Sequence, residues 1–156
     1  MTSITAQAPS ALHDPTADRA EKGLATVVLY LDAVANGEEP THARLLPGEP
    51  VRAEDEEAAI TDAITDVLHA ADGWHWAPTV LDRAITLLGK HEPPAITPHS
   101  EPRDLDTLAG AIAALLTAAE AVTSTTPNTI VDSAETRFQK EADEARFNSV
   151  RRARQN

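Results

Sequence analysis

Hydrophobic residues recur at spacings of three and four along five segments of the chain, a pattern typical of amphipathic helices. The first segment starts at Asp14-Pro15. Asp can accept hydrogen bonds from free first-turn N–H groups, and Pro has no N–H to leave unpaired. We predict a helix over 15–36 that ends at Gly37. Its predicted buried stripe comprises Ala17, Ala20, Leu24, Val27, Val28, Leu31, Val34 and Ala35.

Three more helices are predicted over about 52–72, 78–88 and 104–123. Gly89 is expected to end the 78–88 helix, and Gly110 to permit close contact between the 104–123 helix and a neighbour. Their predicted buried positions are, in chain order, Ile60, Ile64, Val67, Leu68 and Ala71, then Leu81, Ala84, Ile85 and Leu88, then Leu105, Leu108, Ile112, Leu115, Leu116, Ala119 and Val122.

The last helical segment begins at about Thr129. Proline-rich loops are expected over 37–50 and 90–103, with Leu45-Leu46 available to pin the first loop onto the core. Segments of alternating polar and apolar residues, which would predict strands, are lacking. The predicted buried stripe of the last segment is Val131, Ala134, Phe138, Ala142 and Ala145.

These elements predict an all-α fold, a compact bundle of four to five amphipathic helices. We expect a disordered N-terminal segment over 1–13 and a single helical domain over 14–145. Residues 146–156, here called the basic arm, hold four arginines and no acidic residue. This segment is predicted to be either a basic C-terminal helix or an arm outside the helical domain.

Composition excludes several classes of function. The chain has 156 residues and a net charge of −12, which argues against a general nucleic-acid coat or a protein that adheres to anionic membranes. There is no cysteine, so disulfides, thiol catalysis and cysteine-ligated zinc are excluded. Few lysines with abundant Ala, Thr, Asp and Arg point to a bacterium or its phage.

The sequence also predicts where the protein resides. The first residues lack the basic and apolar regions of a secretory signal. The longest apolar stretch, 108–119, is too short to cross a bilayer. We therefore expect a cytoplasmic protein with no membrane segment.

Asp62, Asp66 and His69 share one face of the predicted 52–72 helix. Carboxylates and imidazole are ligands for divalent metals, so these three residues are an alternative metal site. However, they lie opposite the apolar stripe on a helical wheel, and amphipathic helices need a solvated polar face. We therefore expect them to face water, with no metal and no cofactor bound.

The segment ITDAITDVLHAAD around Asp66 resembles the second metal-binding helix of the all-α nucleotide pyrophosphohydrolases of the MazG type. In that family, Glu-x-x-Glu and Glu-x-x-Asp pairs on neighbouring helices hold magnesium against a triphosphate. Here Ala63 stands three residues before Asp66, and Glu21 is followed three residues later by Leu24. No residue is therefore assigned from the resemblance, and a metal-dependent nucleotide hydrolase stays an alternative.

Trp74 and Trp76 form a short connector between two predicted helices. Alternate residues of an extended connector point to opposite sides, so one indole is expected to anchor the core and the other to stay partly exposed. An exposed Trp is a common interface hot spot. The two residues are therefore candidates for interaction as well as for fixing the corner.

Charge is uneven along the chain, with a net of +2 over 133–156 and −14 over the rest. Phe147 lies off the predicted buried stripe, beside Arg151, Arg152 and Arg154. The basic arm is therefore a candidate docking segment for an acidic partner, a sister subunit or nucleic acid, unless it is simply solvated. We expect a non-catalytic protein–protein interaction module that can self-associate, with nucleic acid bound, if at all, through the arm only.

Overall fold

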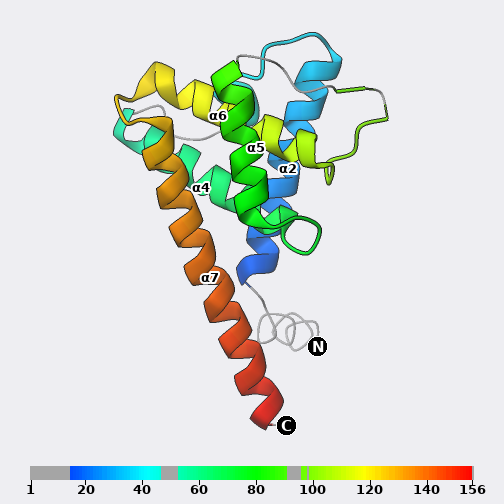
Figure 1. The fold of residues 1–156 in the computed structure, drawn as a ribbon, viewed down its shortest axis with the longest axis vertical. Coiled ribbons are helices and arrows are strands. Elements are labelled where there is room, and N and C mark those ends of the chain that lie inside the picture. Colours follow the sequence, from blue (N-terminus) through cyan, green and yellow to red (C-terminus); the bar gives the residue numbers. More distant parts are fainter. Residues whose placement is uncertain (1–14, 47–52, 91–95, 98, 156) are drawn as a thin grey trace, which may run out of the picture.

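The computed structural model describes residues 15–46, 53–90, 96–97 and 99–155, and every regular element among them is a helix (Figure 1). The predicted all-α class is therefore confirmed. The predicted disordered segment 1–13 lies outside the described residues. The helices are α2 (Pro15–Ala35), α3 (His42–Leu45), α4 (Ala53–Ala71), α5 (Ala77–Lys90), α6 (Leu105–Val122) and α7 (Pro127–Gln155).

Helix ends follow local chemistry, with two departures from prediction. Gly37 and Gly73 have positive φ angles of 69° and 98°, and they follow α2 and α4 as expected for glycine after a helix. Gly89, by contrast, lies inside α5, which continues to Lys90, so the predicted stop there is wrong. The predicted loop 37–50 contains the single turn α3, which is the second departure. The last helix, α7, runs through the basic arm to Gln155.

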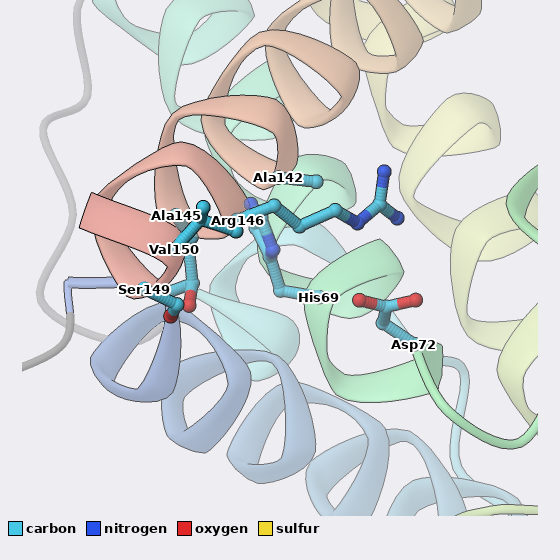
Figure 2. Close-up of a pocket in the computed structure, with 8 residues that line it drawn as sticks. His69, Asp72, Ala142, Ala145, Arg146, Ser149 and Val150 are labelled. Carbon is cyan, nitrogen blue, oxygen red and sulfur yellow. The ribbon is translucent and has the colours of Figure 1, made fainter. Parts of the chain in front are cut away.

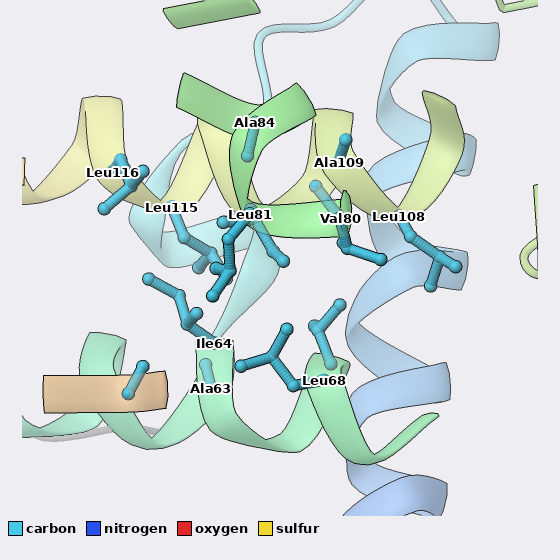
Figure 3. Close-up of a cluster of buried hydrophobic side chains, with 14 of the residues drawn as sticks. Ala63, Ile64, Leu68, Val80, Leu81, Ala84, Leu108, Ala109, Leu115 and Leu116 are labelled. Atoms are coloured by element: carbon cyan, nitrogen blue, oxygen red, sulfur yellow. The ribbon is translucent and has the colours of Figure 1, made fainter. Parts of the chain in front are cut away.

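The aliphatic core lies where α4, α5 and α6 meet. Figure 3 shows Ile64 and Leu68 of α4 pointing toward Leu81 of α5 and Leu115 of α6. All five positions predicted for α4 are buried, as are those at 108, 112, 115, 116 and 119 of α6. Leu45-Leu46 is buried as well, so the predicted pinning of the first loop is confirmed.

The predicted stripe of α2 is partly wrong. Leu24 and Val28 are each 40% exposed, whereas Val27 and Tyr30 are buried. The reason is a close backbone approach at Gly23, where an added Cβ would lie 2.0 Å from the backbone carbonyl oxygen of Asp66 in α4. Since only glycine fits there, α2 presents its Gly23 face to α4 and leaves part of its apolar stripe outside.

α6 is also long and apolar enough, by length and composition alone, to cross a membrane. This is longer than the apolar stretch of 108–119 identified in the sequence. Half of that 18-residue span is buried inside the molecule. Its buried residues pack in the core with α4 and α5, which is the usual environment of a core helix in a folded domain.

Candidate functional site

The polar face of α4 meets α2 and α7 in a cluster of charged side chains. Arg19 of α2 donates a hydrogen bond from Nη1 to Oδ1 of Asp66, at 2.5 Å. Its Nη2 lies 3.1 Å from Oε2 of Glu141 in α7 and 3.9 Å from Oδ1 of Asp62. One guanidinium therefore bridges three carboxylates from two helices and ties both helices to α2.

Two further contacts extend this cluster along α7. Nε2 of His69 lies 2.9 Å from Oε1 of Glu141. The His69 ring packs against Phe138, with ring centroids 4.8 Å apart. Arg137 forms an ion pair with Asp62 at the exposed edge of the cluster. The cluster thus passes from a buried interior at His69 to solvent at Asp62.

The expectation that Asp62, Asp66 and His69 face water is wrong for two of the three. Asp66 and His69 are buried, because α2 and α7 cover the polar face of α4, while the side chain of Asp62 is half exposed. Burial raises the pKa of the Asp66 carboxyl, and the hydrogen bond and positive charge of Arg19 oppose that rise. The face works as a buried contact between helices.

The carboxylates of this cluster do not fit a magnesium site. The guanidinium of Arg19 hydrogen-bonds Asp66 and pairs with Glu141, so it already occupies carboxylate oxygens that a cation would need. Among the residues that the structure describes, no group of three His, Asp and Glu side chains is arranged to hold a metal ion. No hydrolytic step is therefore derived from this cluster.

A groove of about 430 Å³ opens beside the cluster, where α7 leaves the body (Figure 2). Asp72 at the end of α4 lies on one side, and Arg146 and Val150 of α7 on the other. Small side chains at Ala142 and Ala145 leave the space between them open. The groove therefore marks the point at which α7 changes from a packed helix to an exposed one.

From this groove onward, the basic arm is helical and solvent-exposed over 146–154. Phe147 is 66% exposed and Val150 is 52% exposed. Arg151 and Arg154 make no ion pair within the described part of the chain. The arm therefore presents large apolar side chains beside available guanidinium groups.

Trp74 and Trp76 are both exposed, at 55% and 74%, so the expectation that one indole anchors the core is wrong. Backbone hydrogen bonds, together with a contact of 2.8 Å from His75 Nε2 to the carbonyl oxygen of Arg103, hold this corner instead. The Trp74 N–H donates to the carbonyl of Ala71, and the Trp76 carbonyl accepts from the N–H of Val80. These bonds leave both indoles available at the end of the molecule where Asp72 lines the groove.

Sequence reasoning did not single out Arg19, Gly23 or Glu141. The one available signal was Gly23 itself, a glycine inside a helical pattern, which is typical of a close packing contact. Arg19 lies one turn before it, on the same face. No local pattern predicts a role for Glu141, because it contacts His69 across 72 positions of sequence.

A comparison with protein-family models found no match, and comparisons with curated proteins and with solved structures found none either.

Proposed function

We propose that this protein is a non-catalytic, cytoplasmic helical module that binds a protein partner through its basic arm. The observation that carries the proposal is the exposure of Phe147 and Val150 on a helix that continues beyond the body. Aromatic residues and arginines are enriched at the centres of protein interfaces, where they supply most of the binding energy. Arg151 and Arg154 share the helix face of the apolar pair, Arg152 lies on the opposite face, and all three supply charge that an acidic partner can meet.

The tryptophans are assigned to the same interface. Asp72 lines the groove together with Val150, and Trp74 follows Asp72 by only two residues. Exposed Trp74 and Trp76 therefore lie at the end of the body from which the arm projects. We infer that they contribute apolar contact beside the arm, since an exposed indole gains by burial against a partner.

The proposal is tested with the full chain as bait in an extract of the organism of origin. The variant bait is Phe147→Ala/Val150→Ala, and the matched control is Thr117→Ala on the exposed side of α6. We expect a protein that the wild type and the control retain and the variant loses. Equal retention by all three baits would overturn the proposal.

A second measurement addresses nucleic acid. Binding of duplex DNA by the full chain is followed across a salt series, with the chain lacking 146–156 as the comparison. Phosphate contacts release counterions, so an arm that binds DNA gives a steep loss of affinity with salt. We expect weak binding without such a slope, because the net charge is −12. A steep salt dependence that is lost when the arm is deleted would show that the partner of the arm is nucleic acid and not a protein.

A further inference from the structure

The outward face of α2 carries a second apolar surface. Its residues recur at alternating spacings of four and three, which is the pattern of a coiled-coil seam. Leu31 is half-buried and the other members are exposed. This surface, here called the α2 seam, comprises Ala17, Glu21, Leu24, Val28, Leu31 and Ala35.

The described part of the chain leaves this seam open. α2 packs on α4 through the opposite face, where Gly23, Val27 and Tyr30 are buried. Val28 points away from that contact, since it lies 140° around the helix from Gly23 and 160° from Tyr30. Two large aliphatic residues, Leu24 and Val28, each remain 40% exposed on this outward side.

The charges beside the seam are acidic. Glu21 lies within the seam and Asp32 beside it, and both are exposed. The basic arm shows the converse pattern, with Phe147, Val150, Arg151 and Arg154 at spacings of three, one and three. These spacings place its apolar and cationic side chains on one face of α7. An apolar strip with acids thus exists on one helix, and an apolar strip with arginines on another.

We propose that the α2 seam of one copy of this chain receives the basic arm of a second copy. This inference rests on the proposed function and names the protein partner as the chain itself. A two-fold arrangement gives two identical contacts, each pairing one arm with one seam, and closes as a dimer. Charge complementarity selects the arm as occupant, because pairing two α2 seams would bring Glu21 and Asp32 against like charges.

The arm of the same chain does not occupy the seam. Its residues Ser149 and Val150 line the groove beside Thr16, at the beginning of α2. Val28 lies about 18 Å further along α2, from the rise of 1.5 Å per residue. α2 and α7 diverge from this point (Figure 1), and α7 is one continuous helix to Gln155. The contact is therefore made between copies.

The test is a charge exchange followed by sedimentation equilibrium of the full chain over a concentration series. The seam variant is Glu21→Lys/Asp32→Lys, and the arm variant is Arg151→Glu/Arg154→Glu. The wild type should shift from monomer to dimer with concentration, and each variant alone should dimerise at least about tenfold more weakly. An equal mixture should recover the wild-type affinity, because both contacts in the mixed dimer are again between opposite charges.

The matched control is Glu120→Lys/Asp132→Lys, which reverses two exposed acids on α6 and α7. It should dimerise like the wild type, and circular dichroism should show all variants equally helical. A wild type that stays monomeric, a control as weak as the seam variant, or a mixture that fails to recover would each overturn the inference. A monomeric wild type whose bait still retains another protein through Phe147 and Val150 would overturn self-association alone and leave the proposed function standing.

Discussion

α2 and α6 carry similar apolar stripes, but the stripe of α6 is buried and part of the stripe of α2 is exposed. Leu108, Leu115 and Leu116 of α6 are fully buried, whereas Leu24 and Val28 of α2 are each 40% exposed. α6 packs against both α4 and α5, so its stripe has partners along its length. α2 packs mainly on α4 and turns a different face toward it.

The difference shows that apolar content alone does not select the face a helix buries. On α2, the buried face contains Gly23, which permits close backbone approach, and Arg19, which pairs with carboxylates of α4 and α7. The backbone contact and the ion cluster fix the rotation of the helix. The apolar residues on the other side are then left for a contact outside the chain.

The largest expected change in the free energy of unfolding comes from a comparison of one leucine from each stripe. Leu115→Ala should lower the free energy of unfolding by about 2–5 kcal/mol, because it leaves a cavity in a packed core. Leu24→Ala should cost less than about 1 kcal/mol, since this side chain is already partly solvated. Urea denaturation at low protein concentration, where dimers are absent, measures both. Equal losses would mean that the two stripes are equally covered.

The close approach of α2 gives the next effect. Gly23→Ala should cost about 1–3 kcal/mol, because the new Cβ meets backbone atoms of α4 that cannot rotate away. Gly89→Ala is the matched control, since nothing lies within 4 Å of its added Cβ. In the control, alanine should stabilise α5 by up to about 1 kcal/mol. Thermal unfolding compares the two, and a neutral Gly23→Ala would refute the account of how α2 is oriented.

The helices of the core were predictable because each has a single apolar stripe. Leu68 and Leu115 lie on such stripes, and a helix with one apolar face has one way to bury it. α2 has two faces that could be buried, the apolar stripe and the face that contains Gly23. Gly23 decides which face packs on α4, but its effect exists only when α4 lies beside it. Periodicity along one helix carries no information about that partner.

The candidate sites divide in the same way. The exposure of Phe147 followed from its position off the stripe of α7, and the structure agrees. The burial of Asp66 and His69 did not follow, because Asp66 meets α2 across 47 positions of sequence and His69 meets α7 across 72. The polar face of one helix can be covered by the polar face of another, and then it is buried. The spacing of residues within one helix cannot predict which distant charged residue will pair with it.

A smaller effect tests the ion cluster that orients α2. Arg19→Ala should cost about 1–2 kcal/mol at neutral pH, because it leaves Asp66 and Glu141 without their shared cation. Arg137→Ala is the control, and it should cost less than about 1 kcal/mol because its pair with Asp62 is solvent-exposed. Chemical denaturation of both variants at several pH values gives the comparison.

The sign of the pH dependence follows from Asp66. Burial raises its pKa, so the folded chain holds this proton more tightly than the unfolded chain. Its contribution to the free energy of unfolding therefore falls as the pH rises from the unfolded pKa to the folded pKa. Removing Arg19 removes the two largest effects that oppose the rise in this pKa, so the deficit of Arg19→Ala should shrink as the pH is lowered. A deficit that grows in acid would contradict this role for Arg19.

The smallest effect is the ionisation of Tyr30, which does not change stability at neutral pH and tests directly which face of α2 is buried. Tyr30 is the one tyrosine of the chain and lies on that face, where burial raises its pKa to about 12. Its phenolate absorbance should titrate at about that value, with circular dichroism on the same samples to separate titration of the folded chain from alkaline unfolding. Tyr30→Phe supplies the baseline. Since the folded chain holds this proton more tightly, stability should fall as the pH rises from the ordinary pKa of a phenol toward that of Tyr30. A titration midpoint at the ordinary pKa of a phenol, in a chain that is still helical, would mean that Tyr30 is exposed to solvent. The face of α2 described here as buried would then be the exposed one.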